Sequence, residues 1–402
     1  MHTLRIYLLR MGWVGEDGTT WCEPVPGVDS GLKCRGQVIE TTKTVTYQVS
    51  IKELGYGPEP FAIVDALMFA DGKPIVEIPN MSIRLSGLSR DKVEGLWSGT
   101  VPVSQGAVPL AAEMNGLGTV PLTPTVPGQT SPEPLFNRQM CMEFAIGSIA
   151  KMLGPEFAEI DTYPTRVRLP DEPLMLVDRI VTVEGEPRSM SSGRVVTEHD
   201  VTADRWYLDG GRIPTCVAVE AGQADLFLSG YLGIDFISKG KAVYRLLDAV
   251  VTFHRGLPVP GDVIRYDIKI DHFFRQDQTY LFRFNFEGSV NGEPLLSMQN
   301  GCAGFFTAQE LAAGKGIVHT KLDLMPQPGI KPADWRELAP LAVESYDEAK
   351  VDAIYAGDLA GAFGEAFADL PLAKPYTLPG GYLKLVDRVI ELDPQGGRYG
   401  LG

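Results

Sequence analysis

Residues 217–233 read VAVEAGQADLFLSGYLG, and this stretch decides the fold of the chain. Its apolar residues, among them Phe227 and Leu228, cover most of the circumference of a helix, which is typical of a buried helix. Four strand-like segments follow. In the third, aromatic residues stand at every second position from Tyr280 to Phe286, the period of a strand with one buried face. Asn291-Gly292 then supplies a tight hairpin turn.

A buried helix followed by an antiparallel meander predicts the hotdog fold. This is an α+β arrangement in which a curved antiparallel sheet wraps round a long central helix. The sequence also predicts an introductory helix near residues 137–153 and a β-branched strand over 175–181.

The pattern occurs more than once, and out of phase with the chain. LVDRI at 176–180 recurs as LVDRV at 385–389, an offset of 209, and Asp71-Gly72 resembles Asn291-Gly292 at an offset of 220. We therefore expect tandem repeats in a double-hotdog arrangement, in a chain that is a fragment of a modular megasynthase. The predicted segments are the C-terminal part of a hotdog (1–98), a Pro-rich linker (99–135), a complete hotdog with a helical lead-in (136–310), a second linker (311–335) and the N-terminal part of a further, truncated hotdog (336–402).

Composition restricts the classes of function. The net charge of −15 argues against a nucleic-acid partner, which needs clustered Lys and Arg. No apolar run reaches the roughly 18 residues of a membrane span, and the first residues do not resemble a secretory signal. The five cysteines are widely spaced without a C-x-x-C pair, so neither a disulfide framework nor a zinc knuckle is indicated. We expect a reduced, cytoplasmic protein.

Three ordered segments carry a family resemblance. Residues 253–262, FHRGLPVPGD, resemble the strand-turn signature of the 3-hydroxyacyl-(acyl carrier protein) dehydratases. Residues 173–180, PLMLVDRI, are similar to the opening of the 3-hydroxydecanoyl-type branch. Trp206-Tyr207 and then PTCVAVE at 214–220 resemble the segment that leads into the central helix. Tandem repetition of such units is similar to the dehydratase region of polyunsaturated fatty acid synthases and related polyketide-type megasynthases.

The resemblance implies dehydration of 3-hydroxyacyl thioesters, carried on acyl carrier protein, to trans-2-enoyl thioesters. A His of one hotdog would remove the α-proton, and a carboxylic acid of the opposing hotdog would protonate the leaving hydroxyl. Glu220 occupies the position of that acid, where the family usually has Asp, and Gln223 lies three residues on, on the same helix face. Asp225 is off that face, so a surface or capping position is expected.

The resemblance also implies substrate-binding positions. Cys216 and Val217 open the central helix, where backbone N–H groups would hold the thioester oxygen. His254 and Gly256 lie in the strand-turn signature, where they would meet the pantetheine arm. Two structural alternatives stay open: Glu220 as an exposed carboxylate at a helix start, and His254 as a half-buried strand residue.

The family's catalytic His sits in a loop before the central helix, and here that loop, 208–213, contains none. We therefore expect this chain to supply the acid half of a composite site, with the base upstream of Met1; whether the chain is itself an enzyme stays open. The alternatives are a non-catalytic hotdog scaffold and an acyl thioesterase. The five histidines are expected on a helix remnant (His2), at a strand end (His199), in the strand-turn signature (His254), in a turn between strands (His272) and in a linker (His319).

No cofactor is implied, because the elimination changes no oxidation state; the substrate would be carried on the phosphopantetheine of acyl carrier protein. The expected partners are that carrier protein, other megasynthase domains, and a second hotdog through hotdog–hotdog pairing. An acidic carrier protein would dock at basic residues, for which the candidates are Arg212, Lys239, Lys241 and Arg255.

Overall fold

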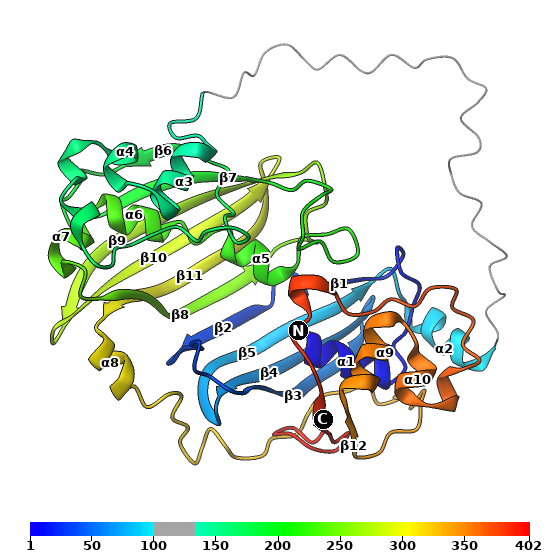
Figure 1. Cartoon of the computed structure of the whole chain (residues 1–402). Helices are drawn as coiled ribbons and strands as arrows, with labels where there is room; N and C mark the ends of the chain where they lie inside the picture. Colours follow the sequence, from blue (N-terminus) through cyan, green and yellow to red (C-terminus); the bar gives the residue numbers. More distant parts are fainter. Residues whose placement is uncertain (100–132) are drawn as a thin grey trace, which may run out of the picture.

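One antiparallel sheet runs through two hotdog units, as Figure 1 shows for the computed structural model, which describes residues 1–99 and 133–402. Its strand order is β3-β4-β5-β2-β8-β11-β10-β9-β7-β6, with β1 added on β5. The tandem hotdog prediction is confirmed. Most of the predicted linker 99–135 lies outside the described residues.

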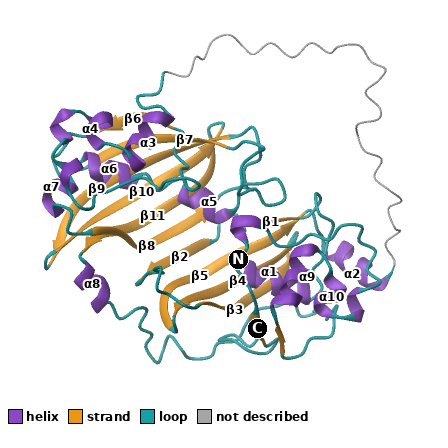
Figure 2. Cartoon of the chain, in the orientation of Figure 1, coloured by secondary structure: helices purple, strands orange, loops and turns teal. Residues whose placement is uncertain are grey.

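The intact unit is contiguous in sequence, and its apolar helices lie on one face of the strands (Figure 2). Phe282, Phe284 and Phe286 of its third long strand are buried, which confirms the predicted aromatic face. Its elements are α3 (Arg138–Ile146), α4 (Ile149–Leu153), β6 (Arg179–Glu184), β7 (Gly193–Asp200), α5 (Thr215–Glu220), α6 (Asp225–Tyr231), α7 (Ile234–Ser238), β8 (Val243–Phe253), β9 (Val263–Gln276), β10 (Thr279–Val290) and β11 (Glu293–Phe306).

The central helix is broken into α5, α6 and α7, whereas the sequence predicts one long helix. Between α5 and α6 the backbone forms tight turns, in which the Gly222 N–H donates to Val219 O and the Gln223 N–H to Glu220 O. Gly222 is required here because a Cβ would lie 2.6 Å from the ring of Phe286. The break in the central helix therefore lies where the sheet, through Phe286, approaches the helix backbone.

The split unit is assembled from both ends of the chain. The sequence predicts that residues 336–402 begin a further hotdog, but Val351 and Ile354 share one buried core with Leu4, Leu9 and Ile83. An amphipathic helix must cover its apolar face, and the sheet of residues 45–86 offers the matching surface. Its elements are α1 (His2–Arg10), β1 (Trp21–Glu23), β2 (Asp29–Cys34), β3 (Val45–Tyr56), β4 (Pro60–Ala70), β5 (Lys73–Ser86), α2 (Arg90–Ser98), β12 (Glu344–Tyr346), α9 (Glu348–Ala356), α10 (Leu359–Phe363) and β13 (Val389–Leu392).

The sequence repeat is also a repeat of structure. Tyr346 pairs with Val389 in the split unit as Phe136 pairs with Ile180 in the intact unit. Both hairpin turns have positive φ, 47° at Asp71 and 55° at Asn291, as predicted. Offsets of 209–210 for residues 346–389 and of 219–221 for residues 12–71 therefore identify equivalent positions, such as Gly12 and Gly233, whose φ angles are 101° and 99°.

The two units join through their β2 and β8 strands. These pair antiparallel from Asp29 opposite Thr252 to Lys33 opposite Asp248. Next to this ladder, the guanidinium of Arg35 holds both carboxylate oxygens of Asp248, at 2.8 and 2.9 Å. The segment from 307 to 335 returns the chain to the split unit, beginning with α8 (Ala308–Ala313). None of the described helices is long and apolar enough to cross a membrane.

Candidate functional site

Glu220 ends α5 and contacts Gln223 across the break in the central helix. The amide Nε2 of Gln223 donates to Oε2 of Glu220 at 3.4 Å, so the expected shared face exists. Partial burial raises the pKa of the Glu220 carboxyl. A carboxyl with a raised pKa keeps its proton closer to neutral pH, which is the state that a general acid needs. The pair can therefore hold and donate a proton.

Asp225 is a second acid beside this pair, and its expected surface position is wrong. Its side chain is 0% exposed. The hydroxyl of Tyr244 donates to Oδ2 at 2.8 Å, while Oδ1 has no hydrogen-bond partner among the described residues. Burial raises the pKa of Asp225 to about 7, and the nearby Glu220 charge adds to the rise, although the Tyr244 hydrogen bond opposes it. The sequence signal was present: residues 224–232 are apolar on nearly all sides, which leaves no solvated face for Asp225.

Cys216 and Val217 lie in the first turn of α5, as expected. The Cys216 side chain is exposed and that of Val217 is buried. However, the N–H of Val217 already donates to the carbonyl of Pro214 at 3.0 Å. This N–H is therefore not free to hold a thioester oxygen in the observed conformation.

His254 and Gly256 lie just after the end of β8 at Phe253. Phe253 points into the core, whereas His254 is exposed and its Nε2 lies 3.1 Å from the hydroxyl of Ser297. A Cβ at Gly256 would lie 2.9 Å from Oε1 of Glu23, which belongs to the other unit. Gly256 thus permits a close contact between the units, and a substrate role for either residue stays a prediction.

The loop 208–213, which lacks the family histidine, is tied to the split unit. The guanidinium of Arg5 on α1, only 4% exposed, pairs with both carboxylate oxygens of Asp209. Arg5 also donates to the carbonyl of Thr377 and lies over the ring of Tyr376, 4.3 Å from its centroid. An ion pair between the units therefore stands where the resemblance would place the loop that carries the base.

The histidines of the chain all lie outside the loop 208–213. His199 is buried in β7, with Nδ1 2.9 Å from Asp178 and Nε2 2.7 Å from the hydroxyl of Tyr207. The expected turn position of His272 is wrong, because it lies inside β9 opposite Arg283. Besides His254, described above, the other two histidines are His2, which lies on α1 as expected, and His319, which contacts Glu77 at 2.9 Å.

Arg212 interacts with side chains of this chain, unlike the other three basic residues that are expected to bind a carrier protein. Its Nε donates to Glu23 at 3.1 Å, and its guanidinium lies 4.2 Å from the ring centroid of Trp21. Lys239, Lys241 and Arg255 are exposed. Across residues 1–99 and 133–402, no group of three His, Cys, Asp or Glu side chains could hold a metal ion.

One sequence family matches segments of both units. The FabA-like domain matches residues 3–79 and 169–299, which together make up just over half of the chain. The chain belongs to the FabA-like family. The matched segments include α1, which begins the split unit, and the stretch from β6 to β11 that contains Glu220.

Among curated proteins, this FabA-like chain is 39% identical over 277 residues to one of the subunits that form the polyunsaturated fatty acid synthase of Thraustochytrium sp.. The alignment covers 67% of this chain, but the chain spans only 18% of that relative.

Two solved structures are also similar. One is an acyl-CoA thioesterase II from Mycobacterium marinum, with 13% identity, 70% of this chain and 81% of that one covered, and a TM-score of 0.35. The other is a dehydratase heterocomplex from Xenorhabdus doucetiae, with 20% identity, 38% and 95% covered, and a TM-score of 0.29.

Proposed function

We propose that this chain contributes the acid half of a site that dehydrates 3-hydroxyacyl thioesters to trans-2-enoyl thioesters in polyunsaturated fatty acid or polyketide synthesis. The observation that carries the proposal is Glu220, which has a raised pKa and is held by Gln223 at the break of the central helix. The family membership and the similarity to part of a polyunsaturated fatty acid synthase support it.

In this mechanism Glu220 gives its proton to the departing hydroxyl. Loss of that hydroxyl as water accompanies removal of the α-proton by a base, so that the new double bond forms without any change of oxidation state. No cofactor is therefore required. The base is a histidine that residues 208–213 do not contain, and a facing hotdog supplies it. Gln223 orients the Glu220 carboxyl through its amide.

The carrier of the acyl chain is an acyl carrier protein, whose phosphopantetheine arm holds the thioester. Lys239, Lys241 and Arg255 are exposed cations to which an acidic carrier protein would bind. The other domains of a megasynthase are further partners. All five cysteines are free thiols, which supports a reducing, cytoplasmic setting.

Replacing Glu220 with Gln tests the proposal. The chain is assayed together with the other synthase components and acyl carrier protein loaded with a 3-hydroxyacyl group, and enoyl thioester is measured by mass spectrometry. Because Gln cannot donate a carboxyl proton, we expect a rate loss of about 10²–10⁴-fold. Glu186→Gln is the matched control, because Glu186 is an exposed loop carboxylate, and it should leave the rate unchanged.

An unchanged rate in Glu220→Gln would contradict the acid role and favour the scaffold alternative. The pH profile gives a second readout. Since the pKa of Glu220 is raised, the rate should fall as rising pH removes its proton, at a pH above the ordinary range of a Glu carboxyl.

A further inference from the structure

The last part of β9 in the intact unit has an edge that β7 does not cover. β7 pairs with β9 from Asp200 opposite Val263 to Gly193 opposite Ile270. β9 continues to Gln276, and beyond Ile270 its only strand partner among the described residues is β10. The side of β9 that faces away from β10 is therefore open over residues 271–276.

The corresponding part of β3 in the split unit is covered by residues 327–335, called the strap here. Ile330 of the strap lies parallel to β3, beside Glu53. The N–H of Ile330 donates to Lys52 O, and the N–H of Leu54 donates to Ile330 O, each at 2.9 Å. One residue of the strap thus gives both its backbone groups to the edge of the sheet.

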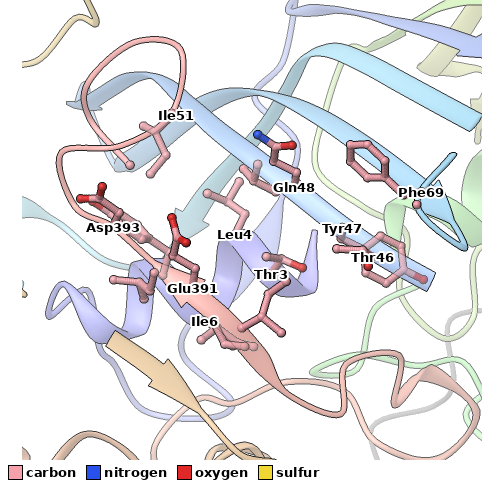
Figure 3. A pocket seen from close by; sticks show the side chains of 18 residues that line it. Thr3, Leu4, Ile6, Thr46, Tyr47, Gln48, Ile51, Phe69, Glu391 and Asp393 are labelled. Atoms are coloured by element: carbon pink, nitrogen blue, oxygen red, sulfur yellow. The ribbon is translucent and has the colours of Figure 1, made fainter. Parts of the chain in front are cut away.

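A shared irregularity aligns the two strands. β3 has a register shift between Ile51 and Glu53, and β9 has one between Ile270 and His272. Ile51 is also the last residue of β3 that lines the pocket of about 420 Å³ in Figure 3. At this offset of 219, the strap lies beyond that pocket, on the part of β3 that corresponds to residues 271–273 of β9.

The exposure of the two strand ends shows the effect of the strap. Each residue over 52–56 of β3 is more buried than its equivalent over 271–275 of β9. Leu54 is 4% exposed and belongs to the core of the split unit, whereas its equivalent, Phe273, is only partly buried. Glu53 is partly buried, whereas its equivalent, His272, is exposed. The end of β9 is thus exposed where the end of β3 is covered.

Two backbone groups of β9 correspond to those that hold the strap. The carbonyl of Asp271 corresponds to that of Lys52, and the N–H of Phe273 corresponds to that of Leu54. On the side away from β10, neither group has a partner within residues 1–99 and 133–402. An open N–H and an open carbonyl on a strand edge pair readily with an extended chain.

A polar pocket lies beside this edge of β9. Its volume is about 650 Å³, and His272 and Arg283, which lie opposite each other on β9 and β10, both line it. Asp271 already accepts a hydrogen bond from Nδ2 of Asn285 at 3.3 Å, and Glu287 lies four residues from Arg283 along β10. Arg283 is exposed and has no ion-pair partner among the described residues. The pocket therefore offers a free cation next to the open edge.

A strand added at this edge places one of its side chains in the pocket. Residues that are paired across neighbouring strands point to the same face of a sheet. The residue that takes the place of Ile330 beside His272 therefore lies in one row with His272 and Arg283. In the split unit the same row consists of Ile330, Glu53 and Ile63. Because the row in the intact unit ends in a free cation, an acidic side chain complements it.

We propose that the edge of β9 at residues 271–273 binds an extended segment of a partner polypeptide, parallel to β9, with a glutamate or aspartate beside His272. A proline stands two residues after this acid, as Pro332 follows Ile330, because a proline cannot donate a hydrogen bond and ends the pairing. Backbone pairing supplies affinity, and the acid supplies selectivity. Acidic connecting segments between domains fit this description. The inference does not depend on the proposed dehydration.

Peptides with the sequence of residues 325–336 are the probes: one unchanged, one with Ile330→Glu and one with Ile330→Lys. Each is labelled with a fluorophore, and its binding to the full chain is followed by anisotropy. We expect the Glu peptide to bind most tightly and the Lys peptide most weakly, with about tenfold between them. N-methylation of residue 330 in the Glu peptide removes the N–H that pairs with Asp271 O, and should weaken binding by about tenfold.

A charge reversal at Arg283 locates the site. Arg283→Glu should invert the order of the peptides, so that the Lys peptide binds most tightly, and the fold should tolerate it because the side chain is exposed. Lys321→Glu, also at an exposed position but outside the pocket, is the matched control and should keep the order. Hydrogen exchange of the Phe273 amide should slow when the Glu peptide binds, while that of the Leu54 amide stays unchanged.

Several outcomes would overturn the inference: no saturable binding, equal binding of the N-methylated peptide, or an order of affinities that Arg283→Glu does not change. If the Phe273 amide is already as protected as the Leu54 amide without peptide, a segment of the chain itself holds the edge, and the proposal of a partner fails. A concentration-dependent dimer in sedimentation that the Glu peptide does not displace would assign the edge to a second copy instead.

Discussion

The intact and split units share equivalent helices and strands, but they are closed by different means. In the intact unit, the strands from β6 to β11 pair with one another within residues 179–306. In the split unit, Arg10 binds Glu344 at 2.9 Å and the Tyr7 hydroxyl binds Leu401 O at 2.8 Å, so its closure joins residues more than 300 positions apart. Long-range closure costs more chain entropy before its contacts form. We therefore expect the intact unit to fold first and the split unit to follow.

The comparison also shows what a repeat in sequence determines. Equivalent residues form equivalent strands and turns in both units. Their burial differs, however: Tyr47 on β3 is equivalent to Tyr266 on β9, yet Tyr47 is 37% exposed and Tyr266 is 0% exposed. The local sequence pattern determines which secondary-structure element forms. The surrounding elements determine how far its side chains are buried, and so how much they stabilise the fold.

Matched substitutions at these two tyrosines give the largest expected effect. Tyr266→Ala removes a fully buried ring whose hydroxyl donates to Ala218 O at 2.6 Å, and should lower the free energy of unfolding by about 3–5 kcal/mol. Tyr47→Ala removes a ring that is already part-exposed, and should cost less than about 1 kcal/mol. Urea denaturation monitored by circular dichroism measures both losses in the free energy of unfolding. Equal losses would show that the two tyrosines stabilise the fold equally despite their different exposure.

A second difference between the units concerns a buried acid. Asp225 in the intact unit is equivalent to buried Leu4 in the split unit, because Gly233 and Gly12 follow the two helices in the same conformation at an offset of 221. Because its pKa is about 7 in the fold and about 3.8 in a free chain, folded Asp225 keeps a proton that the unfolded chain releases. The free energy of unfolding therefore falls as pH rises from about 4 to about 7, by an amount on the order of 4 kcal/mol.

Asp225→Asn should remove this fall, so that the variant is more stable than the parent chain at pH 8 and not at pH 4. Denaturation at a series of pH values checks it, and Glu186→Gln, at an exposed carboxylate, is the control with an unaltered profile. If Asp225→Asn keeps the parental pH dependence, another group causes it. The split unit, with Leu4 at this place, should show no such dependence from its own helix.

Sequence patterns predicted the fold where the signal is local. The alternation over Tyr280 to Phe286 and the Asn291-Gly292 turn each depend on neighbouring residues, and both are observed. The docking of residues 336–402 on 1–98 has no local signal, because its partners are separated by most of the chain. The out-of-phase sequence repeat therefore suggested two incomplete hotdogs, where the structure has one shared core.

The candidate site was predictable to a similar extent. The contact between Glu220 and Gln223 follows from their spacing of three residues. The break in the helix lies at Gly222, where the ring of Phe286 approaches the helix backbone. That approach is a tertiary contact, so helix periodicity could not place the break, whereas the apolar neighbours of Asp225 over residues 224–232 did indicate its burial.

The smallest expected effect concerns the ion pairs that join the units. Asp209→Ala leaves the buried guanidinium of Arg5 without its carboxylate, whereas Asp248→Ala breaks the part-exposed pair with Arg35 at the β2–β8 junction. A buried cation that loses its partner is costly, but Asp209 is itself partly hydrated, so we expect a loss of about 2–3 kcal/mol in the free energy of unfolding. The exposed pair should be worth about 1 kcal/mol or less.

Thermal denaturation shows which of the two ion pairs couples the intact unit to the split unit. If the Arg5–Asp209 pair couples the two units, Asp209→Ala should broaden the melt or divide it into two transitions, the earlier one belonging to the split unit. Asp248→Ala should shift the midpoint slightly and keep the shape of the transition. A single sharp transition in Asp209→Ala, displaced no more than that of Asp248→Ala, would mean that the β2–β8 strand pairing alone holds the units together.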